Sequence, residues 1–176
     1  MIENCSSPHK TVIDVSGIKL SRELVQFNCL KTGEEIVPGS GFFRLLAEHR
    51  INIPFLCTGT IKGGKISFCC VEAECFEPVN KLLEQNPHIR QEIEIIANVG
   101  TLTLYPHRCN LNLVGLIMSE LGKAGIPIYG MATSISALTF STDYPVLNRV
   151  VDILGRALNL PSNHAPFRAQ FRVKQI

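Results

Sequence analysis

The chain carries an internal repeat, and this repeat limits its possible folds more than any other feature. A helix-forming stretch, residues 42–50, leads into Ile51-Asn52-Ile53 and then Thr58, and a similar stretch, residues 116–125, leads into Ile126-Pro127-Ile128 and then Thr133. Both pairs have one offset (126 − 51 = 133 − 58 = 75). A common spacing across a helix and a strand indicates two copies of one structural unit.

Each copy shows the same order of predicted elements. An alternating strand (24–30; 101–105) precedes an amphipathic helix (42–49; 113–121), two strands (51–58 and 65–72; 128–133 and 136–141), a helix that begins at Pro78 or Pro145, and a last strand (92–97; 167–173). The order βαββαβ predicts an α+β fold of two ferredoxin-like units, each an antiparallel sheet with its helices on one face.

We place the first unit at residues 21–97 and the second at residues 98–176. A further strand is predicted at residues 11–20, ahead of the first unit. This strand and the one at 167–173 compete for the edge of the second sheet, and either or both can fill it.

Composition excludes several classes of protein. The 176 residues are 45% hydrophobic and 18% charged, which is typical of a globular core and not of a disordered chain. The net charge is only +2 and no basic stripe occurs, so we expect no nucleic-acid partner. Apolar runs are too short to cross a bilayer, and residues 1–10 do not resemble a secretory signal. We therefore expect a cytoplasmic protein with no membrane association.

The seven cysteines suit a reduced protein in which thiols pack as small apolar groups. A metal site drawn from Cys57, Cys69, Cys70 and Cys75 lacks any C-x-x-C pair, and adjacent cysteines point to opposite faces of a strand. A nucleophilic pair of Cys109 and His107 lacks a recognisable third group. We expect no catalytic residue, metal or cofactor, and keep a Cys-based metal or redox protein as an alternative.

The loops that precede the first helix of each copy are candidate ligand sites. Residues 36–42 and 106–113 each open a helix, where unpaired N–H groups and the positive end of the helix dipole favour a carboxylate. Gly39, Ser40 and Gly41 are small enough for a ligand to approach the backbone. The alternative is that Ser40 or Asn110 simply caps its helix and nothing binds.

Several of these residues resemble the ACT domain. They are Pro38-Gly39 before a helix, Leu46-Ala47-Glu48 followed by Ile51-Asn52-Ile53, and Thr133-Ser134 before an alternating strand. The layout from about residue 11 to residue 158 resembles, more narrowly, the tandem ACT regulatory region of aspartokinases. Val15-Ser16-Gly17-Ile18 is similar to the leading strand of that region, which joins the second ACT unit.

The resemblance implies a non-enzymatic regulatory module that binds an amino acid at the interface between ACT units. It also implies a homodimer and a biosynthetic enzyme as a partner in trans. The ligand residues it implies are Val37, Pro38, Gly39, Ser40, Gly41, Phe42, Asn52, Ile53 and Thr58 in the first unit, and Cys109, Asn110, Asn112, Leu113, Ile128, Tyr129, Thr133 and Ser134 in the second.

The sequence departs from the aspartokinase pattern in three respects, one of which is that the first loop and helix are shorter than in the family. Where lysine sites of the family often carry an aspartate, this chain has Pro54 and Tyr129, so we do not expect lysine as the ligand. No nucleotide-binding start of an amino-kinase domain occurs, so the family's kinase activity is not implied. A ligand-free dimerisation protein with an ACT fold is the second hypothesis.

Overall fold

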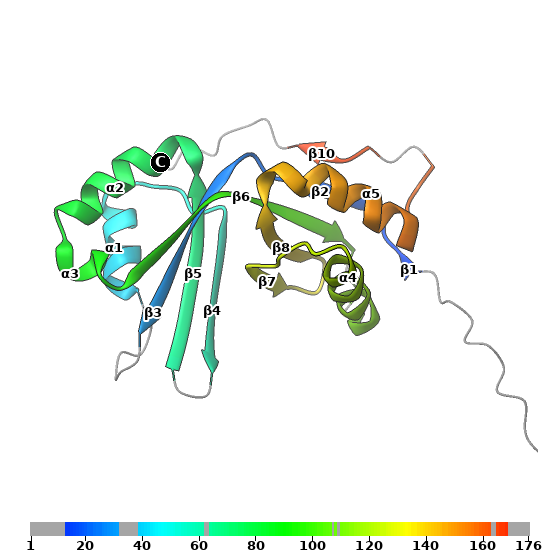
Figure 1. Ribbon diagram of the computed structural model, residues 1–176, viewed down its shortest axis with the longest axis horizontal. Helices are drawn as coiled ribbons and strands as arrows, with labels where there is room; N and C mark the ends of the chain where they lie inside the picture. The colour runs from blue at the N-terminus through cyan, green and yellow to red at the C-terminus, as the bar shows by residue number, and fades with distance from the viewer. Residues whose placement is uncertain are drawn as a thin grey trace, which may run out of the picture.

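Two α+β units share one continuous strand. The computed structural model describes residues 13–31, 39–61, 64–106, 108, 110–162 and 165–168. Strand β6, residues Ile93–Tyr105, runs out of the first sheet and into the second (Figure 1). The predicted α+β fold with ferredoxin-like units is confirmed.

The first unit contains β3 (Leu24–Lys31), α1 (Ser40–Glu48), β4 (Phe55–Ile61), β5 (Gly64–Glu72), a short 3-10 turn (Ala73–Cys75), α2 (Phe76–Glu84), α3 (Pro87–Arg90) and the start of β6. The strand order is β6-β3-β5-β4, and all neighbours are antiparallel. Helices α1 and α2 cover one face of this sheet (Figure 1). This arrangement leaves β4 at an edge.

The second unit uses the end of β6, then α4 (Leu111–Lys123), β7 (Gly130–Thr133), β8 (Leu138–Asp143), a 3-10 turn (Tyr144–Val146) and α5 (Leu147–Ala157). Its fourth strand is β2 (Gly17–Leu20), which pairs antiparallel with β6 on the side away from β8. Strand β10 (Phe167–Arg168) lies parallel to β2, outside it. Strands β1 (Ile13–Asp14) and β9 (Leu158–Asn159) form a separate parallel pair.

A β-bulge in the middle of β6 divides the two units. Leu24 pairs with Val99 whereas Gln26 pairs with Ile96, so Ala97 and Asn98 together face one residue of β3. Asn98 adopts a positive φ of 55°, a conformation that asparagine tolerates better than most residues. The unit boundary proposed at 97/98 therefore falls inside β6.

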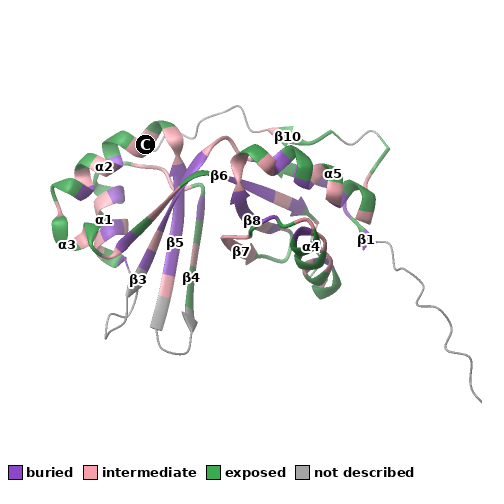
Figure 2. Ribbon diagram, in the orientation of Figure 1, coloured by how far each residue is buried: buried purple, intermediate pink, exposed green. Residues whose placement is uncertain are grey.

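Each unit has an apolar core between its sheet and its helices (Figure 2). Helix α1 buries Phe42 and Leu46, which are one turn apart. Helix α4 buries Leu113, Ile117 and Leu121 at the same spacing. The apolar periodicity of the sequence therefore marks the sides of the helices that face the sheets.

Several predicted boundaries were wrong, and proline explains most of the differences. The strand predicted at 51–58 begins at Phe55, and the one predicted at 128–133 begins at Gly130. Pro54, which has no N–H to donate to a ladder, directly precedes the first start, whereas Pro127 lies three residues before the second. As a result, Asn52 and Ile53 lie in a connector, not on a strand, while Thr58 lies within β4 and not at the next turn.

The remaining boundary differences are smaller. Helix α2 begins at Phe76, two residues before Pro78, and α5 begins at Leu147 after a 3-10 turn that contains Pro145. The strand predicted at 136–141 spans residues 138–143, and the one predicted at 11–20 is split into β1 and β2. Of the strand predicted at 167–173, residues 169–173 lie outside the described residues.

Candidate functional site

The start of α1 is an open helix N-terminus beside a cavity. Gly39 precedes the helix with a φ of 76°, and no side chain caps it. The N–H groups of Ser40, Gly41 and Phe42 have no acceptor among the described residues, because the first backbone bond of the helix is donated by Phe43 to the Gly39 carbonyl at 2.8 Å. The predicted capping of α1 by Ser40 is therefore absent.

A glycine is required at position 39. Its positive φ strains residues that carry a Cβ, and a Cβ built there would overlap the Cys29 thiol. The helix start therefore lies directly on β3. A cavity of about 480 Å³ opens beside it, lined by the segment 39–42 together with Arg44, His88, Ile89, Glu92 and Ile93. Such a cavity has room for a small ligand.

The start of α4 is different, because its own side chain caps it. The Asn110 Oδ1 accepts a hydrogen bond from the Asn112 N–H at 3.0 Å. Leu113 is fully buried in the core and Asn112 is exposed, so the two predicted ligand residues point in different directions. Capping by Asn110, the alternative that the sequence left open, is what the structure shows.

The other predicted ligand residues are scattered. Ile53 packs against the first core and Ile128 against the second. Thr58 is exposed on β4. Thr133 ends β7, and Ser134 opens the turn after it, where its Oγ accepts from the Ala137 N–H at 3.0 Å. The predicted residues Val37, Pro38 and Cys109, and the paired candidate His107, lie outside the described residues. Among the predicted ligand residues that the structure describes, only Gly39–Phe42 lie together at one site within the chain.

The two units meet along a seam of apolar side chains. A third apolar cluster fills it, formed by Leu24, Phe55, Phe68, Cys70 and Val99, with Tyr129 and Ala132 packed against them. The rings of Phe55 and Phe68 meet edge to face with centroids 5.6 Å apart. A Cβ at Gly130 would overlap the Phe68 ring, so glycine there lets the ring lie on the β7 backbone. Part of the helix-free face of the first sheet is therefore covered from within the chain.

A buried polar network crosses this seam. Gln26, fully buried on β3, accepts through its Oε1 a hydrogen bond from the Ser141 Oγ on β8 at 2.8 Å and one from the Cys70 thiol at 3.8 Å. Its Nε2 donates to the Asn28 Oδ1 at 2.8 Å, and the Asn28 Nδ2 donates to Glu94 at 3.0 Å. Because its buried members are satisfied, the network fixes one relative position of the two units.

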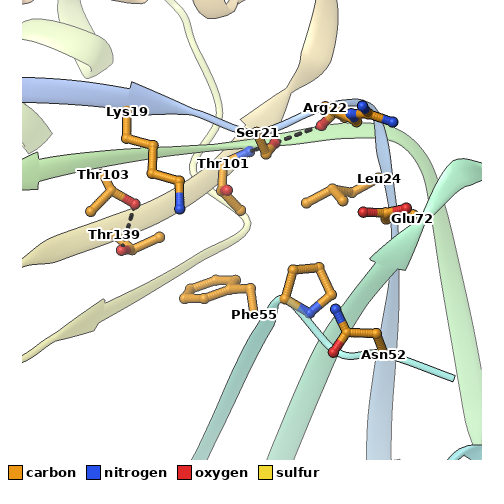
Figure 3. A pocket seen from close by; sticks show the side chains of 11 residues that line it. Lys19, Ser21, Arg22, Leu24, Asn52, Phe55, Glu72, Thr101, Thr103 and Thr139 are labelled. Atoms are coloured by element: carbon orange, nitrogen blue, oxygen red, sulfur yellow. Dashed lines mark hydrogen bonds between the residues drawn. The ribbon is translucent and has the colours of Figure 1, made fainter. Parts of the chain in front are cut away.

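A second cavity, of about 390 Å³, lies beside the seam (Figure 3). The face of the second sheet opposite its helices supplies Lys19, Thr101, Thr103 and Thr139, and the first unit supplies Asn52, Phe55 and Glu72. Of these, only Asn52 was predicted as a ligand residue. The alternation along β6 could have placed Thr101 and Thr103 on this face, because Leu102 and Leu104 point into the core.

The cysteine alternative gains no support. Burial raises the pKa of the Cys29 thiol to about 12, with a further contribution from Glu92, and burial raises the pKa of Cys70 to about 12. The pKa of the Cys69 thiol is raised further, mainly by burial. Such thiols stay protonated at neutral pH and are poor nucleophiles and ligands. Cys69 and Cys70 point into different apolar clusters. In the described part of the chain no three His, Cys, Asp or Glu residues are grouped to hold a metal.

None of the helices in the described part of the chain is both long and apolar enough to span a membrane.

Solved structures share this fold. The regulatory subunit of aspartate kinase from Thermus flavus aligns with a TM-score of 0.67 at 14% identity, over 82% of this chain and 98% of that one. The ligand-free regulatory subunit of aspartate kinase from Thermus thermophilus aligns with a TM-score of 0.67 at 15% identity, over 82% of this chain and 99% of that one. A chain in a structure of aspartokinase alpha and beta subunits gives 0.68 at 17% identity, over 81% and 97%. No family model and no curated protein matches the sequence. The resemblance to the aspartokinase regulatory region is confirmed as a likeness of fold.

Proposed function

We propose that this protein is a non-catalytic regulatory module that binds an amino acid at the start of α1 and acts on a biosynthetic enzyme in trans. The observation that carries the proposal is the uncapped N-terminus of α1 beside a cavity of about 480 Å³. The fold likeness supports it, because regulatory subunits of aspartate kinase are covered almost end to end by this chain. A protein of that kind works in the cytoplasm.

The chemistry of the site suits a zwitterion. The α-carboxylate accepts hydrogen bonds from the N–H groups of Ser40, Gly41 and Phe42, and the helix dipole adds to the attraction. The ammonium faces the Glu92 carboxylate, which lines the same cavity. A ligand shared between two units links its binding to their relative orientation, which is how binding becomes a signal.

In this proposal a second copy assembles through the edge of the first sheet opposite β6, which is the strand that helps to line the cavity at the start of α1. Strand β4 is at an edge of the sheet and none of its seven residues, Phe55–Ile61, is charged. Leu56 on this strand is 48% exposed. Edge strands without charge, proline or cover pair readily with another chain. Pairing through β4 gives a homodimer with a continuous sheet.

The ligand-free dimerisation protein remains the second candidate, and two observations favour it. The start of α4 is capped by Asn110, so one of the two predicted loops is closed to a carboxylate. The seam inside the chain is packed with apolar side chains and does not need a ligand to hold it. In this candidate, the β4 edge is the functional surface.

A thermal-shift panel of the twenty amino acids separates the two candidates. A ligand that binds only the folded state stabilises it by about 2.7 kcal/mol at a hundredfold excess over Kd, and the melting temperature rises as a result. The response must disappear in Gly41→Val, whose side chain enters the cavity. Gly115→Val is the matched control, since no heavy atom lies within 4 Å of a Cβ there. A flat response to all twenty compounds refutes amino-acid binding and leaves the dimerisation protein.

A further inference from the structure

The helix-free face of the second sheet carries a row of polar side chains. Lys19 on β2 pairs with Thr103 on β6, and Thr103 pairs with Thr139 on β8, so the three side chains lie side by side across three strands. Figure 3 shows the Lys19 side chain beside Thr103, with its ammonium directed into the cavity beside the seam. This is the cavity of about 390 Å³, and it is separate from the one at the start of α1.

The hydroxyl pair has a hydrogen left to donate. The Oγ1 atoms of Thr103 and Thr139 are 2.9 Å apart and share one hydrogen bond, which uses one of their two hydroxyl hydrogens. Lys19 has no hydrogen bond or ion pair with any described residue. An ammonium and a free hydroxyl on one row are the donors that a carboxylate accepts from.

The opposite wall carries the complementary charge. Glu72, at the end of β5, lines the same cavity, and neither its side chain nor that of Asn52 bonds to another described residue. No ion pair joins Glu72 to Lys19 across the cavity. Phe55 and Leu24 lie between these polar groups and supply an apolar floor (Figure 3). Arg22 also lines the cavity and pairs with Glu74 at 3.9 Å. The cavity therefore has Lys19 on one side, the Glu72 carboxylate on the other and an apolar surface between them.

We propose that this cavity is a second ligand site, which takes a small zwitterion with a hydrocarbon side chain. The carboxylate lies on Lys19 and the threonine pair, the ammonium faces Glu72, and the hydrocarbon packs on Phe55. Because the walls belong to different units of one chain, this site needs no second copy. A bound molecule stabilises the arrangement of the two units that the Gln26 network already selects.

Backbone NMR with L-leucine as the probe tests the site. At millimolar L-leucine we expect shifts of the Thr101, Thr103 and Thr139 amides. Two analogues with the same hydrocarbon separate the charges: L-leucinamide lacks the carboxylate, and 4-methylpentanoate lacks the amine. Lys19→Gln weakens leucine binding about tenfold or more, the factor expected for one lost charged hydrogen bond. Lys81→Gln, an exposed lysine on α2 that does not line the cavity, is the matched control and leaves binding unchanged.

Glu72→Gln provides the second arm of the test. It weakens binding of L-leucine but leaves 4-methylpentanoate unaffected, because only the amino acid has an ammonium for Glu72 to hold. The proposal is overturned if Lys19→Gln binds leucine as well as the parent does, or if the leucine shifts are confined to Ser40, Gly41 and Phe42. That second result still supports the site at the start of α1. Shifts at neither place refute leucine binding at both.

Discussion

Replacing Gly130 with alanine tests whether the seam is as tightly packed as the structure shows. The new Cβ would lie 2.5 Å from the Phe68 Cε2 and 2.8 Å from its Cε1, well inside ordinary contact distance, with the Cζ closer still. The ring must move, and it then loses its edge-to-face contact with Phe55. Overpacking of this kind costs about 1–3 kcal/mol, which lowers the melting temperature by roughly 2–4 °C per kcal/mol in a chain of this size.

The sign of the effect is informative. Alanine in a strand interior is otherwise better than glycine by about 0.5–1 kcal/mol, so a stabilised Gly130→Ala protein would refute the packing described for the seam. Urea unfolding followed by circular dichroism measures the free energy of unfolding. Gly122→Ala is the control, because nothing lies within 4 Å of its Cβ and the substitution should stabilise α4. The double variant Gly130→Ala/Phe68→Leu should recover part of the loss.

Three further predictions concern the buried polar groups. Gln26→Met leaves the Ser141 hydroxyl without its acceptor and should lower the free energy of unfolding by about 1–3 kcal/mol in the same urea assay; an unchanged value would contradict the role given to the network. The hydrogen bond to Asp143 at 2.6 Å, with burial, raises the pKa of Tyr129 from 10.0 to about 12. The contribution of this hydrogen bond to the free energy of unfolding is therefore fully present below pH 10 and is lost as the pH rises towards 12. Tyr129→Phe should therefore flatten part of the alkaline loss of stability, and an identical pH profile would exclude this cause. Cys29 and Cys70 should resist alkylation by iodoacetamide at pH 8 in the folded protein and react once urea unfolds it, as mass spectrometry of the peptides can show; labelling of either in the folded state would contradict their burial.

Sequence periodicity was sufficient to predict the architecture. The 75-residue offset identified two copies, and three- and four-residue spacings identified the buried faces of α1 and α4. Helix amphipathicity and strand alternation are local patterns, so they can be read directly from the sequence. Strand starts were less accurate, because the apolar pattern at Ile51–Ile53 continues through a segment where Pro54 prevents regular pairing.

The candidate site was only partly predictable. Glycines and a helix start at Gly39–Phe42 form a local signature, and the structure places a cavity there. The cavity beside the seam joins Lys19, Thr103 and Glu72, which are far apart in sequence and meet only because β2 and β6 pair and the units pack together. No local pattern contains that information. The bulge at Asn98, which turns β6 from one sheet into the next, is likewise a tertiary feature.

The origin of β2 has a consequence for how the protein is made. Residues 17–20 are synthesised before every other strand of the second sheet, yet their hydrogen-bonding partner is β6 at residues 102–105, and β8 follows still later. Chains emerge from the ribosome N-terminus first, so this segment has no sheet to join while residues 24–97 are being translated. Ile18 and Leu20, fully buried at the end, stay in water until then. The segment that forms β2 is thus anchored only when the C-terminal half of the chain is complete. Proteolytic protection of nascent chains should reach Ile18 only after β6 has left the exit tunnel.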